Sequence, residues 1–282
     1  MKRQIPVTVI SKSKNRISGT LAFIACTALI LAGCATAPPA DDKVAMAAFK
    51  EANDPYEPFN RAMFDFNLAL DKAVLRPAAS IYRDVLPEPV QNGVHNFLHN
   101  LRSPIIFGND LLQGELDRAG STLARFAINS TVGILGLYDF AAYVGIEKHN
   151  EDFGQTLAVW DVEQGPYLVL PIFGPSNPRD GVGKVADILI DPLTWLAPFE
   201  FQMARTIGTA VNARARNFDQ VNDLENNSLD FYSAVRSLYR QKRADEIRNG
   251  VPLDTNAVIG NLPAMPDEKS EHSQAVTSQN GK

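Results

Sequence analysis

Two histidines four residues apart are the first candidates for chemistry. His95 and His99 would lie on one face of a helix, at the spacing of two zinc ligands. Asn96 stands where the HExxH pattern requires glutamate, however, and no third ligand is signalled. We therefore predict no metal site.

The stretch GPSNP (174–178) is the second candidate, because it is close to the GxSxG turn that exposes a nucleophilic serine. Pro178 replaces the last glycine of that pattern, which argues against Ser176 as the nucleophile of a hydrolase. The neighbouring GVGKVA (181–186) imitates a dinucleotide-binding GxGxxA. It lacks a βαβ context, and Val185 follows Lys184 where a P-loop needs Ser or Thr. The sequence therefore predicts no nucleotide site and no cofactor.

The sequence around Cys34 gives a clearer indication of its chemistry than the sequence around the other candidates does. It follows Leu31-Ala32-Gly33, and the 33 residues before it hold five Lys or Arg, no acid and an apolar run of about 15 residues, as a signal peptide does. That run is too short for a membrane span, which needs about 20 residues. LAGC matches the bacterial lipobox, and this resemblance implies that the chain is cut before Cys34 and that its thiol is acylated, for example with palmitate.

The mature chain that this predicts is acidic and has no disulfide. It keeps 22 Lys and Arg (27 less the five of the signal) against 32 acids, a net charge near −10. Such a charge argues against binding nucleic acid and against holding a membrane by a basic surface. We expect signal peptide 1–33, a tether over 34–53, one folded domain over 54–250 and a mobile tail over 251–282, which is rich in polar residues.

Helical periodicity dominates the predicted domain, so the fold class is mainly α. Apolar residues recur at three- and four-residue steps from Phe59 until Pro77 intervenes, and again over 90–101. Ser103-Pro104 predicts the start of a third helix, which Gly114 closes. A fourth covers 116–127, and a long one runs over 229–248. Only YLVLPIF (167–173) is rich in β-formers, and its proline favours an edge strand or an extended loop near 165–180.

Two stretches are too apolar for a simple soluble bundle. The only charge in 126–146 is Asp139, and 164–178 has none. The two explanations are a buried core and a surface that faces lipid. Because no mature segment reaches 18 uncharged residues, a single helix across the membrane is not expected.

Several local motifs follow one another along the chain: NDPYEPFNRAMFDFN (53–67), NFLHNLRSP (96–104), ARFAINSTVGILGLYD (124–139), FGQTL (153–157) and GPYLVLPIFGPSNPRD (165–180). In this order they closely resemble the MlaA family, also called VacJ. The resemblance covers about 54–250, and WDVEQG (160–165) departs from a glycine-rich pattern that many members carry. Within the motifs we single out Asp54, Pro55, Phe59, Asn60, Arg61, Arg179 and Asp180.

This resemblance implies a ring-like domain of short amphipathic helices that encloses a channel. It implies an outer-membrane lipoprotein of Gram-negative bacteria, anchored in the periplasmic leaflet, that extracts misplaced phospholipids from the outer leaflet. Trimeric porins would be its neighbours, and a soluble periplasmic carrier would receive the lipid. Ala35 fits outer-membrane sorting, because Asp at that position usually signals retention in the inner membrane. A membrane-bound lipid hydrolase and a structural lipoprotein that tethers porin are the alternatives.

For each part of such a channel, two explanations stay open. Asn109, Asp110 and Asp139 are candidates for a polar lining, because polar groups in apolar segments tend to face cavities; helix capping is the other explanation. Arg179-Asp180 is interpreted as an ion pair or helix start, with headgroup contact as the alternative. A stiff, glycine-hinged loop that gates the channel, or an ordinary turn, would be formed by Gly165, Pro166, Tyr167, Pro171, Gly174 and Pro175.

Overall fold

The computed structural model describes residues 53–251 together with 39, 42, 46 and 49. The predicted signal peptide, Cys34, and all but a few residues of the tether and tail lie outside this part. The chain divides into two compact units, Met1–Arg243 and Ala244–Lys282. In the second unit, the described residues continue the last helix to Ile247 and end at Val251.

The described part is mainly helical, as predicted, and has one small hairpin where the sequence predicted an edge strand or an extended loop. The two strands are β1 (Leu168–Leu170) and β2 (Gly174–Ser176), which pair antiparallel with Val169 opposite Pro175. The helices are α3 (Glu57–Leu70), the π-helix η1 (Asp71–Leu75), α4 (Arg76–Val85), α5 (Glu88–Gln113), α6 (Leu116–Thr131), α7 (Phe140–Tyr143), α8 (Phe153–Val159), α9 (Pro178–Ile190), α10 (Pro192–Leu196), α11 (Phe199–Arg216), α12 (Phe218–Asn227) and α13 (Phe231–Ile247).

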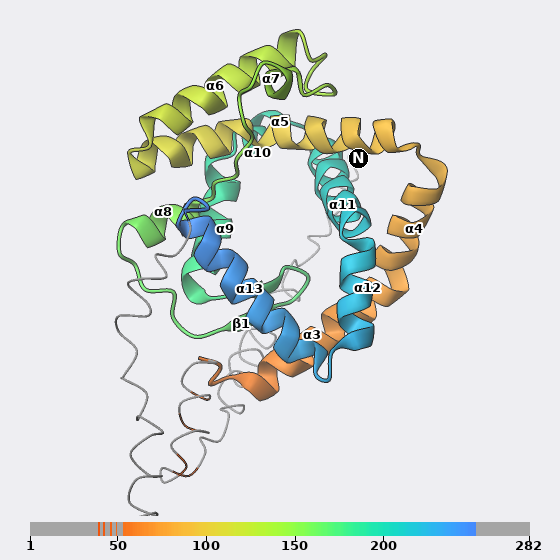
Figure 1. Cartoon of the computed structure of the whole chain (residues 1–282), viewed down its shortest axis with the longest axis vertical. Helices are drawn as coiled ribbons and strands as arrows, with labels where there is room; N and C mark the ends of the chain where they lie inside the picture. The colour runs from red at the N-terminus through yellow and green to blue at the C-terminus, as the bar shows by residue number, and fades with distance from the viewer. Residues whose placement is uncertain (1–38, 40–41, 43–45, 47–48, 50–52, 252–282) are drawn as a thin grey trace, which may run out of the picture. The chain divides into compact units, whose positions relative to one another are not determined.

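Helices of the first unit make a closed circuit of contacts. Contacts run from α3 through η1 and α4 to α11, then to α5, α8 and α9. The circuit closes because β2 leads along the chain into α9, and its partner strand β1 contacts α3. Figure 1 shows these helices around a common centre, with α6 and α7 outside the circuit against α5. The expectation of a ring-like helical domain is confirmed by this arrangement.

Two predicted helix boundaries are wrong, and both involve proline. The chain stays helical from Glu57 to Val85, because η1 precedes Pro77 and the Arg76 N–H donates to the Asp71 carbonyl five residues back. A wider turn of this kind accommodates a residue that has no N–H to donate. Pro104 lies inside the single helix α5, where its buried neighbours Ser103 and Ile105 anchor the chain; packing here outweighs the loss of one backbone bond.

Helix ends elsewhere follow the residue types. Asp139, Asp152, Asn177 and Asp191 each cap the N-terminus of a helix by accepting a backbone N–H. Gly114 ends α5 with a φ of 81°, as predicted. These caps set where the short helices α7, α8, α9 and α10 begin.

The interior of the described part is polar. Nine hydrophobic residues are buried, four of them alanines, against twenty polar or charged ones. One small apolar cluster joins Tyr167, Val169 and Tyr232. Many large hydrophobic side chains are exposed instead, including Val182, Val185 and Leu189 of α9. The usual amphipathic arrangement of a soluble helix is thus reversed.

The apolar stretch 126–146 takes part in this reversal. Ile134, Leu135 and Tyr143 are 58%, 66% and 86% exposed, so they do not form a core. Within the described part, no helix is long and apolar enough to cross a membrane.

Two glycines allow α8 and α9 to touch. A Cβ on Gly183 would lie 2.4 Å from the Gly154 nitrogen, and one on Gly154 would lie 2.5 Å from the Arg243 guanidinium. Backbone atoms cannot move aside as a flexible side chain can. The close contact between these two helices therefore depends on both glycines.

Gly183→Ala should consequently destabilise the fold by about 1–3 kcal/mol through overpacking. The measurement is the midpoint of thermal unfolding in mild detergent. Gly120→Ala is the control, because a Cβ on this helical glycine meets nothing within 4 Å and the variant should be as stable as the parent or more so. Equal midpoints for the two variants would contradict the role of the α8–α9 contact.

Candidate functional site

The hairpin of β1 and β2 is held in place by side chains of α3. Asn60 Nδ2 donates to the Tyr167 carbonyl (2.9 Å), and Asn60 Oδ1 accepts from the Val169 N–H (2.9 Å). Asn67, two turns later, donates to the Leu170 carbonyl (2.9 Å) and accepts from the Ile172 N–H (2.7 Å). Each amide thus bonds to β1 as the backbone of a neighbouring strand would.

A third asparagine continues this pattern beyond the helix. Asn53 Nδ2 donates to the Gly165 carbonyl (2.8 Å), and the Asn53 carbonyl accepts from the Tyr167 N–H (2.8 Å). Asn53, Asn60 and Asn67 are spaced seven residues apart, so we call them the asparagine clamp. The clamp fixes the segment from Gly165 to Ile172 along its length.

The tip of the hairpin is apolar and exposed. Ile172 and Phe173 are 72% and 62% exposed, and Pro171 lies in the turn before them. Gly165 and Gly174 have φ values of 70° and 73°, and a Cβ on Gly174 would meet nothing within 4 Å. The predicted loop residues therefore bracket a projecting hairpin, and Pro166 and Pro175 lie beside its two positive-φ glycines.

Asp54 is the charged centre beneath the clamp. Its Oδ1 accepts from Asn60 Nδ2 (2.7 Å), and its Oδ2 accepts from Arg236 (2.7 Å) and from the Tyr232 hydroxyl. Asp54 is 3% exposed, and burial raises the pKa of Tyr232, which keeps this hydroxyl protonated as a donor. The other residues of this motif act nearby: Pro55 lies in the turn before α3, Phe59 lies on α3 itself, and Arg61 pairs with Glu57 (2.8 Å) and Asp230 (2.6 Å).

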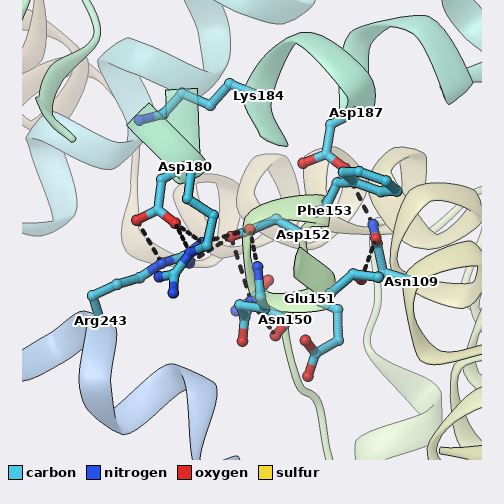
Figure 2. A network of polar contacts seen from close by, with 12 residues as sticks. Asn109, Asn150, Glu151, Asp152, Phe153, Asp180, Lys184, Asp187 and Arg243 are labelled. Carbon is cyan, nitrogen blue, oxygen red and sulfur yellow. Dashed lines mark hydrogen bonds and ion pairs between the residues drawn. The ribbon is translucent and has the colours of Figure 1, made fainter. Parts of the chain in front are cut away.

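A second ionic centre joins α8, α9 and α13. Arg243 donates to Asp152 (2.7 Å) and to Asp180 (2.9 and 3.0 Å), and Figure 2 shows its guanidinium between the two carboxylates. Burial alone would raise the pKa of Asp152, but the hydrogen bonds and charge of Arg243 outweigh it and hold that pKa at about 2. Arg179 also donates to Asp180 (3.1 Å), and Asp180 lies in the first turn of α9. The ion pair and helix start predicted for Arg179-Asp180 are both present.

The candidate lining residues have defined partners. Asn109 is fully buried, donates to Asp187 (3.1 Å) and accepts from the Thr156 hydroxyl (2.7 Å). Asp110 is equally buried and accepts from the Thr122 hydroxyl (2.6 Å), with His149 Nε2 at 3.0 Å.

Helix capping, one of the two explanations for these residues, applies to only one of them. Asp139 caps α7 and binds Arg125 (2.7 Å), so the capping explanation holds for it. Asn109 and Asp110 lie inside α5 and cap no helix N-terminus. For all three, lining a channel stays a prediction.

Unlike the carboxylates of the two ionic centres, Asp187 forms no ion pair with a Lys, Arg or His side chain of the described part. It accepts from Asn109 Nδ2 and from the Phe153 N–H (3.0 Å), and burial raises its pKa to about 6. Figure 2 shows Asp187 and Asn109 linked on the far side of Asp152 from Arg243. This carboxyl titrates near neutral pH.

The residues considered as catalytic candidates, His95, His99 and Ser176, form contacts that are typical of a structural role. His95 contacts Asn212 (3.2 Å), whereas His99 donates from Nε2 to the His149 carbonyl (3.1 Å), and burial lowers the pKa of His99 to about 4. No group of three or more His, Cys, Asp or Glu within the described residues is arranged to hold a metal ion. Ser176 is fully buried, and its hydroxyl lies 3.1 Å from the Lys184 ammonium.

Several important residues were missed by the sequence analysis. Asn53 and Asn67 lie in the motif at 53–67, on either side of Asn60. Their seven-residue spacing from Asn60 was the signal that could have identified them. Arg236 and Arg243 gave no such signal, because a basic residue on a polar helix normally faces solvent. Their buried carboxylate partners lie more than 60 residues away in sequence.

The fold and these centres define a helical protein whose charged groups pair inside and whose apolar side chains lie outside. A family model described as MlaA lipoprotein matches residues 52–246. The chain is 35% identical over 205 residues to the "Intermembrane phospholipid transport system lipoprotein MlaA" of Escherichia coli K12, which covers 71% of this chain and 80% of that protein. The protein of the same name from Haemophilus influenzae is 32% identical over 266 residues, covering 91% and 97%.

A solved structure supports the same family assignment. The chain matches a structure described as "Structural basis for maintenance of bacterial outer membrane lipid asymmetry", with 37% identity and a TM-score of 0.62. The match covers 69% of this chain and 98% of that one. The chain belongs to the MlaA lipoprotein family.

Replacement of Arg243 should strongly lower the stability of the folded protein. Arg243→Met leaves the buried Asp180 and the half-buried Asp152 without their shared cation, and we expect a loss of about 3–5 kcal/mol in the free energy of unfolding. Arg83→Met is the control, because the Arg83–Asp219 pair is exposed and its loss should change stability much less. Denaturant titration in detergent measures both; equal losses would rule out a special role for Arg243.

Asp187 should make stability depend on pH. A carboxyl whose pKa rises from 3.8 to about 6 on folding takes up a proton between these values, so stability falls as the pH rises through that window. Asp187→Asn keeps an oxygen for both hydrogen bonds and should gain about 1 kcal/mol at pH 7.5, with no gain below pH 4. Thermal unfolding at both pH values tests this, with exposed Asp65→Asn as the control. A gain that is the same at both pH values would refute it.

Proposed function

We propose that this chain is an outer-membrane lipoprotein that removes misplaced phospholipids from the outer leaflet and passes them to a soluble periplasmic carrier. The single observation that carries the proposal is the reversed distribution of polarity in a closed circuit of helices. Exposed apolar side chains on α9, α10 and the segment 132–144 suit contact with lipid. Membership of a family whose named members transport phospholipids gives the direction of the inference.

A polar route through the circuit would supply what the bilayer lacks. Moving a headgroup through hydrocarbon buries a charge without a partner, which is very expensive. Helices satisfy their own backbone hydrogen bonds at membrane depth, so short helices around a path are stable there. Asn109 and Asp110 are buried polar residues of α5 within this circuit, and Asp139 caps α7 beside it. In our proposal, small movements of α5 and α7 expose these residues to the headgroup.

The hairpin is proposed as the gate of this path. Its tip is apolar, its base is fixed by the asparagine clamp, and its two positive-φ glycines lie on either side of the tip. A fixed base with a projecting apolar end suits a barrier to acyl chains. Ordinary turn geometry is the competing explanation.

The acylated Cys34 would anchor the chain in the periplasmic leaflet, because two or three acyl chains hold a membrane far more firmly than one. A trimeric porin is the proposed neighbour. Because the sequence gives no nucleotide site, direction would come from the higher lipid affinity of the carrier.

Two alternatives make different predictions in one assay. Labelled phospholipid is moved from outer-membrane vesicles to a soluble acceptor, and the products are analysed. Intact lipid in the acceptor supports transport; lysolipid or free fatty acid would indicate a hydrolase, for which the buried Ser176 is poorly placed. Absence of both, with altered porin organisation on loss of the protein, would favour a structural tether.

Gly174→Asp tests the gate in this assay. The added carboxylate lies beside the apolar tip, and we expect intact lipid transfer to change severalfold, while stability falls by only about 1 kcal/mol from the positive φ. Gly114→Asp is the matched control, because this glycine has a φ of 81°, nothing lies within 4 Å of its added Cβ, and it ends α5 away from the hairpin. Equal effects of the two variants on transfer would support the turn explanation.

A further inference from the structure

Most cationic side chains of residues 53–251 pair with a carboxylate. Four have no carboxylate oxygen within 4 Å in that part of the chain: Arg102, Lys148, Lys184 and Arg216. Arg102 instead donates to the Glu151 carbonyl (3.3 Å) and Lys184 to the Ser176 hydroxyl (3.1 Å). Lys148 and Arg216 converge on the same place, the junction of α5 and α11.

Hydrogen bonds across this junction bring three basic groups together. His95 Nδ1 lies 3.2 Å from Asn212 Oδ1, and Arg216, one turn further along α11, donates to Asn92 Oδ1 (3.0 Å). Lys148 Nζ lies 3.3 Å from His95 Nε2. We call Lys148, His95 and Arg216 the basic junction.

The protonation of His95 follows from its neighbours. Asn212 donates its amide hydrogen to the Tyr82 hydroxyl (2.9 Å), so its Oδ1 is the acceptor that faces His95. A neutral His95 therefore carries its proton on Nδ1 and accepts from Lys148 through Nε2. The Lys148 ammonium keeps two further N–H groups for another acceptor.

The junction lacks a neutralising charge. Burial lowers the pKa of His95, and the charges of Lys148 and Arg216 lower it further. Burial likewise lowers the pKa of Lys148, and Arg125 and Arg216 add to the effect. Asp139 acts in the opposite direction, but its carboxylate already binds Arg125 (2.7 and 2.8 Å) and Asn129. Like charges held together in a partly buried site favour the binding of an anion.

Apolar surface lies directly beside these charges. Leu137 is 43% exposed and lies against Gly93, between Asn92 and His95 on α5, with a Cβ built on Gly93 3.6 Å from the Leu137 carbonyl. Val90, on the same part of α5, is 47% exposed. A ligand that joins an anionic group to an apolar chain fits both surfaces at once.

We propose that Lys148, Arg216 and His95 bind the phosphate of a phospholipid headgroup while its acyl chains lie against the apolar residues beside α5. The proposal rests on the proposed function and assigns one position on the lipid path. Arg216 and Lys148 would hold the phosphate oxygens by charge-assisted hydrogen bonds. Neutral His95 would orient Lys148.

The test is binding of a short-chain phosphatidylglycerol to the full chain in detergent, measured by ³¹P NMR titration. Lys148→Gln with Arg216→Gln should weaken binding by about tenfold or more, since both charge-assisted contacts are lost. Lys72→Gln, which removes an exposed cation of η1, should bind as the parent does. Lys148→Gln alone should show an intermediate loss, and the unfolding midpoints of all variants verify that each is folded.

Two comparison ligands distinguish a site for the phosphate of a lipid from a site for free phosphate. Inorganic phosphate should bind far more weakly than the lipid; equal binding of both would mean a site for free phosphate and would overturn the lipid assignment. A short-chain diacylglycerol, which has no phosphorus and is therefore followed by ¹H NMR, should bind the parent and the double variant equally. Unchanged phosphatidylglycerol binding by the double variant would refute the site, and intact lipid transfer by that variant would leave the proposed function standing.

Discussion

The ion pairs of Arg243 with Asp152 and Asp180 are the interaction on which the packing of the helices in this protein depends. Arg243 lies on α13, Asp152 caps α8 and Asp180 lies in the first turn of α9, and a full apolar core is absent from the described residues that surround them. Two carboxylates held close together and largely removed from water would repel each other, so a shared cation between them is needed to stabilise them. The contact also requires Gly154 and Gly183, since a side chain at either position would occupy the space of the guanidinium or of the facing backbone.

The same principle repeats around the circuit of helices. Asp54 is held by Arg236 and Tyr232, Asp71 by Arg214, and Asp191 by Arg205. Directional polar contacts take the place of an apolar interior here, which leaves the hydrophobic side chains free to face outward. A protein with this distribution of polarity is poorly suited to water alone, and a lipid surface is the surrounding that satisfies its exterior. The reversed polarity and the proposed transport of phospholipid are in this sense one property.

The sequence predicted the kinds of element better than their contacts. Periodicity identified the helices around Phe59 and Leu116 correctly, because it depends only on local spacing. It failed at Pro77 and Pro104, where a π-turn and tertiary packing keep the chain helical. The β-rich run at 167–173 predicted an edge strand or an extended loop near 165–180, where the structure has a hairpin. The clamp that holds this hairpin was visible only as three asparagines at equal spacing. The role of Arg243 could not be predicted, since its partners are distant in sequence and a basic residue in a polar helix usually lies in solvent.

The outward position of the apolar side chains is tested most directly by tryptophan fluorescence. The chain has two tryptophans, Trp160 and Trp195, and Trp195 is 71% exposed on α10, next to the apolar face of α9. Trp160→Phe leaves Trp195 as the single reporter in protein reconstituted into vesicles. Quenching by lipids brominated on their acyl chains, with little quenching by aqueous acrylamide, is the predicted result. Quenching by acrylamide alone would mean that this surface faces water, and it would contradict the central claim.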